Sequence, residues 1–387
     1  MIMTKSVFFV GSARSFFKRM IKNSELRAEF ITQNDSFYKD TSFKRALLSK
    51  IVRLKIFNWV GLIQVIRSSG KECDLYGSFN RFLKVDKPYF ILLEQPSALY
   101  HYTIGRNTSY WGKRVIKKHL NDSNLKAIIC RSNACFTTFE KLCGDVPVHC
   151  RKKLIYSYVS TNKHATVKKL SERCDNPVFS LLFIAQGSRF VSKSGLETIE
   201  AFKRLKEKYP NVELTILTSV SLIHKNIISD IKSIDGVTLL DFTLSYSQLE
   251  ELYVNSTLLL HPTSDDSNSL TVLEAMKAGL PIISTKLYAI PEMVKDGVNG
   301  FLTEPKYAFF DNNNLPNPQV WDNRKKTIYS TKLDENIINF ICSKVELLLL
   351  DRELLLKMSL NSLRLANTPP FDESTIISEW NKILEEI

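Results

Sequence analysis

The sequence has no long apolar run. None of its segments approaches the roughly 20 consecutive apolar residues that a membrane-spanning helix requires, which excludes a spanning helix. The apolar run at residues 6–11 is shorter than the hydrophobic region of a secretory signal, and the chain returns to charged residues soon after Gly11. We therefore expect a cytoplasmic protein.

Paired cysteine motifs are also missing. The seven cysteines are an odd number at irregular spacings, and no Cys-x-x-Cys motif occurs among them. This pattern argues against a disulfide framework and indicates free thiols in a reducing compartment. Cys130 and Cys135 lie close together in the sequence, but no second pair matches them. We expect core thiols there rather than a zinc site.

Acidic residues are too few to balance the basic ones. The chain has 53 Lys and Arg against 40 Asp and Glu, a formal charge of +13. Such an excess attracts nucleic acid, anionic lipid surfaces or phosphorylated small molecules, although it can also serve solubility alone. The charge is dispersed and no basic-aromatic nucleic-acid signature occurs, so a nucleic-acid-binding protein is the weakest of these alternatives. The basic segment at residues 43–57 leaves open a peripheral contact with an anionic membrane surface.

Length and composition predict a globular protein of two domains. The chain has 387 residues, of which 44% are hydrophobic and 24% charged. Short apolar segments alternate with amphipathic ones in two series, which predicts the α/β class with two doubly wound parallel sheets. A polar segment at 161–177 separates the series. We predict domains at residues 1–165 and 176–365, followed by a terminal helix at 366–387.

Two parallel sheets in tandem would bring the carboxyl ends of their strands together across a central cleft. Loops and helix amino termini converge at such an edge, and the positive end of a helix dipole favours anions. The architecture therefore predicts an anionic small-molecule ligand, but it does not identify the chemistry.

The segment at residues 257–281 contains a strand, a loop rich in helix-capping residues and an amphipathic helix. Glu274, about one turn into the helix, could accept two hydrogen bonds from a ribose diol. Asp266 lies in the loop before the helix, nearer to the chemical group that is attached to the phosphates. The structural alternatives are a helix cap for Asp266 and a solvated charge for Glu274. The free backbone N–H groups that could meet a diphosphate belong to Ser269, Leu270 and Thr271.

Residues 260–305 resemble the donor-binding signature of the retaining GT-B glycosyltransferases of family 4, the glycosyl transferases group 1. That signature places a Glu eight positions after an acid, and this spacing selects Asp266 over Asp265 as the partner of Glu274. Further matches to the signature are Ala278, Gly279, Pro281, Pro291, Glu292, Asp296, Gly297 and Gly300.

The chain departs from the family pattern at three places. The first acid is Asp266 instead of Glu, and Ser267-Asn268-Ser269 replaces Gly-Phe-Gly. Tyr288-Ala289 with Ile290 stands where the family has a Gly-Gly pair. These differences affect the expected identity and position of the sugar more than the expected nucleotide site.

The resemblance implies a GT-B fold, in which two Rossmann-like domains face a central cleft. It implies retaining, metal-independent transfer of a sugar from a UDP- or GDP-sugar to a glycan or lipid-linked acceptor, in cell-surface polysaccharide synthesis. The first domain would bind the acceptor, and the terminal helix near Trp380 would pack back on it. A glycan phosphorylase or epimerase, or an inactive sugar-binding homologue, would share the fold.

The resemblance also assigns roles to individual residues. Lys193 and Arg189, in the turn after the strand at 178–187, would neutralise the leaving diphosphate. Asp266 would hold the sugar hydroxyls. Glu94 stands where many members carry a His, so the role of that His does not carry over to this chain. Glu94 is the acceptor-side candidate, and a structural role is the alternative. The other candidate contacts of the nucleotide sugar, in the loop of Asp266 and the helix after it, are Glu274, Asn268, Ser269, Leu270 and Thr271. Apart from the resemblance, the turn of Gly11 and Ser12 after the first strand would face the cleft and could approach the phosphates or the acceptor.

Overall fold

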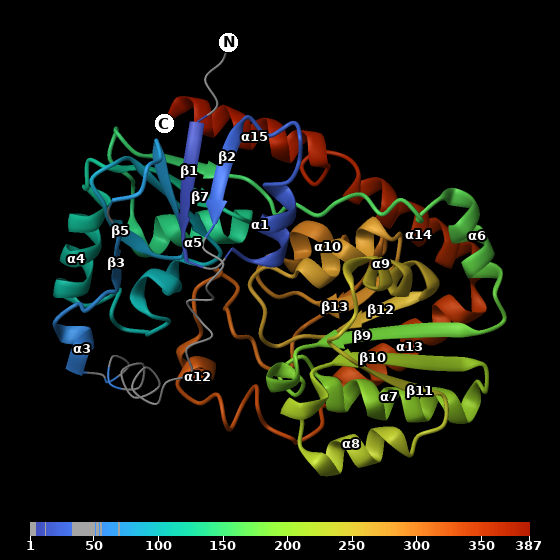
Figure 1. Cartoon of the computed structure of the whole chain (residues 1–387). Helices are drawn as coiled ribbons and strands as arrows, with labels where there is room; N and C mark the ends of the chain where they lie inside the picture. The colour runs from blue at the N-terminus through green and yellow to red at the C-terminus, as the bar shows by residue number, and fades with distance from the viewer. Residues whose placement is uncertain (1–4, 12, 33–50, 52–53, 55, 69) are drawn as a thin grey trace. The chain divides into compact units, whose positions relative to one another are not determined.

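The computed structural model describes residues 5–11, 13–32, 51, 54, 56–68 and 70–387. The chain divides into two compact units (Figure 1). Unit 1 comprises Met1–Val159, Asn312–Pro316 and Glu373–Ile387, and unit 2 comprises Ser160–Asp311 and Asn317–Asp372. Within the described residues, no helix is both long and apolar enough to cross a membrane.

Unit 1 contains a six-stranded, wholly parallel sheet with the strand order β2-β1-β4-β6-β7-β8. Its strands are β1 (Lys5–Val10), β2 (Ala28–Thr32), β4 (Leu75–Phe79), β6 (Tyr89–Leu93), β7 (Leu125–Cys130) and β8 (Arg151–Leu154). A two-stranded parallel sheet joins β3 (Val65–Arg67) and β5 (Phe82–Lys84). The helices are α1 (Ser15–Met20), α3 (Ile56–Trp59), η1 (Pro96–Tyr100), α4 (Tyr110–Leu120), α5 (Asn133–Cys143) and α15 (Glu373–Glu386). Every residue of the central strand β6 is buried, as expected for a strand covered on both faces.

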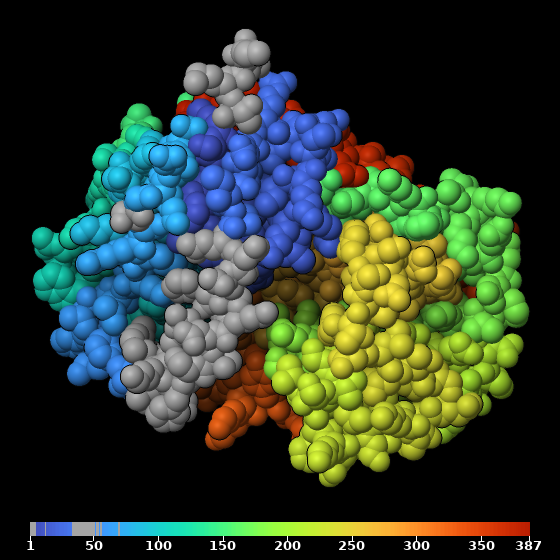
Figure 2. All heavy atoms as spheres, in the orientation of Figure 1, coloured from blue at the N-terminus to red at the C-terminus, as the bar shows by residue number. Residues whose placement is uncertain are grey.

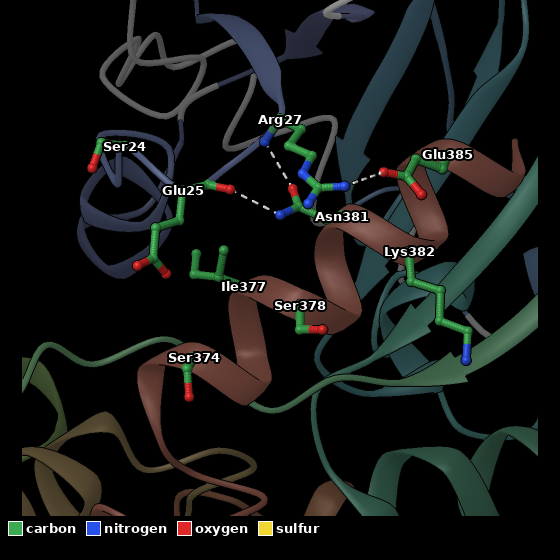
Figure 3. A pocket seen from close by; sticks show the side chains of 9 residues that line it. All are labelled: Ser24, Glu25, Arg27, Ser374, Ile377, Ser378, Asn381, Lys382 and Glu385. Carbon is green, nitrogen blue, oxygen red and sulfur yellow. Dashed lines mark hydrogen bonds and ion pairs between the residues drawn. The ribbon is translucent and has the colours of Figure 1, made fainter. Parts of the chain in front are cut away.

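The terminal helix α15 is part of unit 1. The ring of Trp380 lies 5.7 Å from that of Phe17 and 5.7 Å from that of Phe90, so it completes the core beside the sheet. A polar groove of about 600 Å³ runs between α15 and the segment before β2 (Figure 3). At this groove the Arg27 backbone N–H donates to the Asn381 side chain, and the Asn381 amide donates to the Glu25 carbonyl. These bonds tie the end of the chain to its beginning.

Unit 2 contains a second six-stranded parallel sheet, with the order β11-β10-β9-β12-β13-β14. Its strands are β9 (Phe179–Ala185), β10 (Val212–Thr218), β11 (Val237–Asp241), β12 (Leu258–His261), β13 (Ile282–Thr285) and β14 (Gly300–Thr303). The helices are α6 (Val167–Asp175), η2 (Gly187–Arg189), α7 (Gly195–Lys208), η3 (Val220–Leu222), α8 (Lys225–Lys232), α9 (Tyr246–Asn255), α10 (Leu270–Lys277), α11 (Ile290–Met293), α12 (Pro318–Trp321), α13 (Glu335–Leu350) and α14 (Arg352–Ala366). In the space-filling view, α8 and α9 form part of the surface of this unit (Figure 2).

The two predicted parallel sheets are confirmed, but two details differ from the expectation. The segment at 161–177, expected to be a polar linker, contains helix α6. Leu170 and Cys174, four residues apart, form its buried face. A single apolar pair in a segment of mostly charged residues is too weak a pattern to predict a helix. In addition, the short strands β3, β4 and β5 were not predicted, because none of them is a long apolar run.

Candidate functional site

The site in unit 2 is built on the loop between β12 and α10. Ser269 is the N-cap of α10, and its hydroxyl accepts a hydrogen bond from the Val272 N–H. The backbone φ of Ser269 is −78°, and neither Ser267 nor Asn268 has a positive φ. The loop therefore does not need the conformational freedom of glycine, and the three substitutions cost no backbone strain.

Two ion pairs link this loop to the turn that follows β9. The Lys193 ammonium lies 2.6 Å from Asp266 Oδ2. The Arg189 guanidinium lies 2.9 Å from Asp265 Oδ1, and it also donates to the Asp265 carbonyl. The spacing argument passed over Asp265, yet this residue is the partner of Arg189. The spacing of a family motif identifies residues with a shared role within one segment. It does not identify an acid that pairs with a cation on a different loop.

Burial and charge together fix the protonation of the Lys193–Asp266 pair. Burial alone would raise the pKa of Asp266, but Lys193, a hydrogen bond from His261 and Arg189 hold that pKa well below its usual range. Burial lowers the pKa of the Lys193 ammonium, and the Asp266 carboxylate opposes this shift. Because the two atoms lie at ion-pair distance, we assign Asp266 as a carboxylate bound to the Lys193 ammonium.

A cavity of about 220 Å³ opens beside these ion pairs at the carboxyl ends of β9 and β11. Its lining includes the cations Arg189 and Lys193. It also includes Glu274, whose carboxylate accepts a 3.2 Å hydrogen bond from the buried Tyr253 hydroxyl. The remaining lining residues are Ile184, Ala185, Gln186, Phe242, Leu249 and Thr271. Apolar walls, a carboxylate and two cations are together suited to a base, a ribose diol and a diphosphate.

The structure brings together only some of the predicted donor-site residues. Arg189, Lys193, Thr271 and Glu274 line the cavity, whereas Asp266 is linked to it through Lys193. The other three candidates of this loop, Asn268, Ser269 and Leu270, do not line the cavity.

Sequence reasoning did not find His261, Tyr253 and Phe242. His261 ends an apolar strand, and a polar residue at the carboxyl end of a buried parallel strand is a signal that could have found it. Nothing in the sequence pairs Tyr253 with Glu274, because the two residues lie on different helices.

Of the candidates in unit 1, Glu94 belongs to a cluster of charged side chains. Glu94, directly after β6, lies 2.9 Å from Arg14 and 3.8 Å from the buried Arg131. Two guanidinium groups thus lie around this carboxylate. Gly11 has a φ of +92°, and an added Cβ would meet open space. Ser12 and most of the segment 43–57 lie outside the described residues.

Metal ligands are not grouped in the part of the chain that the structure describes. No cluster of three or more His, Cys, Asp or Glu side chains there could hold a metal ion.

Comparisons with known proteins give the site its context. Residues 181–309 match the family model for glycosyl transferases group 1. The sulfoquinovosyl transferase SQD2 of Arabidopsis thaliana is 32% identical over 66 residues, which are 16% of this chain and 13% of that protein. The aligned region is thus a small part of the curated relative.

Solved structures match nearly the whole chain. Anabaena HepE in complex with UDP-glucose covers 99% of this chain and 100% of its own, with 16% identity and a TM-score of 0.61. WaaG, a glycosyltransferase involved in lipopolysaccharide biosynthesis, covers 98% of this chain and 99% of its own, with 13% identity and a TM-score of 0.59. The two parallel sheets and these matches identify the GT-B fold. Residues 181–309, about a third of the chain, are similar to the glycosyl transferases group 1.

Proposed function

We propose that this protein is a retaining, metal-independent glycosyltransferase that moves a sugar from a nucleotide-diphosphate sugar to a glycan or lipid-linked acceptor. The observation that carries the proposal is the cavity in unit 2, where Arg189, Lys193 and Glu274 from two segments converge beside apolar walls. The family match over residues 181–309 supports it. The complex of HepE with UDP-glucose favours a UDP-sugar over a GDP-sugar as the donor.

In this proposal the two cations stabilise the departing diphosphate. Arg189 and Lys193 are held in place by Asp265 and Asp266 until the donor binds, and the phosphate oxygens then share them. The acceptor hydroxyl attacks the anomeric carbon as the bond from that carbon to the phosphate oxygen breaks. The leaving diphosphate takes the acceptor's proton on the same face, so no protein base is required. Charge develops on the diphosphate in the transition state, where fixed cations act most strongly.

The remaining parts of the donor have partners in the same unit. Glu274, held by Tyr253, accepts from the ribose diol, and Asp266 accepts from sugar hydroxyls. The base lies against Phe242 and Leu249. Thr271, in the first turn of α10, lines the same cavity and would meet the phosphates.

Unit 1 would take the acceptor, at the cluster of Glu94 with Arg14. A lipid-linked acceptor would place the protein at the cytoplasmic face of a membrane. The surface of α3 and α4 supports this placement, because Trp59 and Trp111 are exposed there beside basic residues of α4. A role in cell-surface polysaccharide synthesis is in keeping with the stated role of WaaG.

A panel of UDP- and GDP-sugars tests the proposal by measuring nucleotide release with and without candidate acceptors. We expect turnover of one donor class, and the Glu274→Gln variant to lose about 10- to 100-fold in kcat/KM, since hydrogen bonds to a charged group are worth about 1.5–3 kcal/mol. The exposed Glu213 on β10 offers a matched control, and Glu213→Gln should retain full turnover.

The other outcomes separate the alternatives. Unchanged turnover in Glu274→Gln would refute the donor-site assignment. Release of a sugar phosphate on addition of inorganic phosphate would indicate a phosphorylase. Binding of a nucleotide sugar without any turnover would indicate an inactive sugar-binding homologue, and salt-sensitive binding of an oligonucleotide would favour the nucleic-acid alternative.

A further inference from the structure

His261 is a buried imidazole that contacts the proposed sugar-binding acid. It ends β12, its side chain is fully buried, and its carbonyl accepts a 2.7 Å hydrogen bond from Ser284 on the neighbouring strand. Its Nε2 lies 3.1 Å from Asp266 Oδ2 and 3.0 Å from the Ser269 hydroxyl. One ring nitrogen therefore contacts both the loop acid and the N-cap of α10.

The partners of the ring determine its tautomer. The Asp266 carboxylate can only accept, so we assign the proton to Nε2. Burial lowers the pKa of His261 to about 4, with Lys193 and Arg189 adding to the effect and Asp266 opposing it. The ring is therefore neutral near pH 7. Nδ1 has no hydrogen-bond partner among the described residues, and in this tautomer it is an acceptor rather than a buried N–H without a partner.

The Asp266 carboxylate is held from three directions. Oδ2 accepts from Lys193 at 2.6 Å and from His261 at 3.1 Å, and Oδ1 accepts from the Ser267 backbone N–H at 3.0 Å. A carboxylate offers about four acceptor positions, so roughly one remains for a ligand. The three donors fix the direction in which this remaining acceptor position points.

We propose that His261 is a positioning residue that sets the direction in which Asp266 accepts a hydroxyl of the donor sugar, and thereby helps to select that sugar. The inference rests on the proposed function, in which Asp266 meets the sugar. It also accounts for two departures from the family pattern. Asp266 is shorter than the usual Glu, and His261 supports it from the sheet. Ser269, at the position of a family glycine, links the same imidazole to the helix.

The test compares two replacements of His261. His261→Leu replaces the imidazole with an apolar side chain of similar size and so removes the hydrogen-bond donor. His261→Gln can place an amide N–H near the position of Nε2. The readouts are kcat/KM for the preferred donor, its ratio to the kcat/KM of a donor epimeric at one sugar hydroxyl, and the Kd of the matching nucleotide diphosphate without sugar. His164→Leu serves as the control, because residue 164 is exposed on unit 2.

In His261→Leu we expect kcat/KM for the preferred donor to fall by about 10-fold or more and the discrimination between epimers to shrink by a similar factor. The Kd of the nucleotide diphosphate should stay within about 2-fold, because the cavity lining is intact. His261→Gln should recover most of both sugar-dependent losses. A purely structural role would instead weaken donor and nucleotide alike, and that result, or full discrimination in His261→Leu, would overturn the inference.

A spectroscopic measurement tests the geometry without any turnover, so a failed donor assay remains distinguishable from a failed inference. In ¹⁵N-histidine-labelled protein, His261 should appear as the neutral Nε2–H tautomer at pH 7 and at pH 5. The Asp266→Asn variant should shift its ring resonances. An Nδ1–H tautomer, with no proton on Nε2, would overturn the inference even if the protein transfers sugar.

Discussion

At the scale of single residues, the proposed donor site depends on charges that neutralise one another before any ligand binds. Arg189 pairs with Asp265 and Lys193 with Asp266, so neither cation is buried without a counter-ion. An unpaired buried charge would cost several kcal/mol. The two acids therefore neutralise the cations until an anionic ligand binds. The ligand can then replace the carboxylates as the partner of the cations.

The neutral state of His261 predicts a pH dependence of stability. Its pKa is about 4 in the folded protein and about 6.5 in an unfolded chain. Between these values the unfolded chain binds a proton that the folded chain does not. The free energy of unfolding should therefore fall as the pH falls from about 6.5 to about 4, by about 3 kcal/mol from this residue.

Urea unfolding at several pH values measures this contribution. The charged groups that face the ring are Lys193, Arg189 and Asp266. The two cations do not titrate in this range, and Asp266 contributes only at its lower end. His261→Gln should show a shallower decline than the unmodified protein over the same range. Equal slopes for the two proteins would contradict a neutral buried imidazole.

At the scale of secondary-structure elements, a buried arginine of α6 binds backbone carbonyls of two other helices of unit 2. The Arg173 guanidinium donates to the carbonyls of Val254, Ala278 and Gly279, which lie at the carboxyl ends of α9 and α10. These ends carry partial negative charge, so the cation is stabilised without a carboxylate. Burial lowers the pKa of Arg173 to about 10, and the residue stays charged near pH 7. The sequence shows Arg173 only as one more charge in a polar segment.

Replacing Arg173 should destabilise unit 2 strongly. Arg173→Met removes all of these donors and leaves buried carbonyls unpaired, which should cost about 3 kcal/mol or more in the free energy of unfolding. Arg173→Lys keeps the charge but not the forked geometry, so we expect an intermediate loss. Denaturant unfolding of both variants measures this, with the exposed Lys203→Met on α7 as the control. A loss in Arg173→Met no larger than in the control would show that the carbonyls find other partners.

At the scale of the whole molecule, the net charge of +13 is accompanied by an exposed apolar surface in unit 1. Trp59 is 78% exposed on α3, and Trp111 is 51% exposed on α4. The Ser109 hydroxyl at the start of α4 donates to the carbonyl of Asn58, which holds the two helices side by side. The exposed basic residues of α4 are Lys113, Arg114, Lys117 and Lys118. Aromatic rings beside such cations suit the interface of an anionic bilayer.

Vesicle sedimentation tests this contact. We expect the protein to bind vesicles that contain anionic phospholipid, to bind purely zwitterionic vesicles much less, and to lose binding as salt screens the charges. Trp59→Ser combined with Trp111→Ser should weaken binding by about 10-fold, since each ring buries apolar area at the interface. Val148→Ser, at another exposed apolar residue of unit 1, is the control. Equal binding to both kinds of vesicle, or no effect of the double variant, would contradict the proposal.

The sequence by itself determined the class of the fold and the position of the main loop. Strand periodicity and capping residues are local, so the two parallel sheets and the helix that carries Glu274 could be predicted from short segments. The spacing of Asp266 and Glu274 also lies within one continuous stretch. For the same reason, a short helix with a single buried pair, such as α6, could not be predicted.

Only the tertiary structure decided which side chains meet. Arg189 and Asp265 are separated by 76 residues, and Lys193 and Asp266 by 73, so their pairing follows from the adjacency of β9 and β12 in the sheet. The contact of His261 with Asp266 spans just five residues, yet it depends on the loop folding back over its own strand. Local patterns specify elements, whereas the partners of a buried charge are set by the order of strands, which a single sequence does not state.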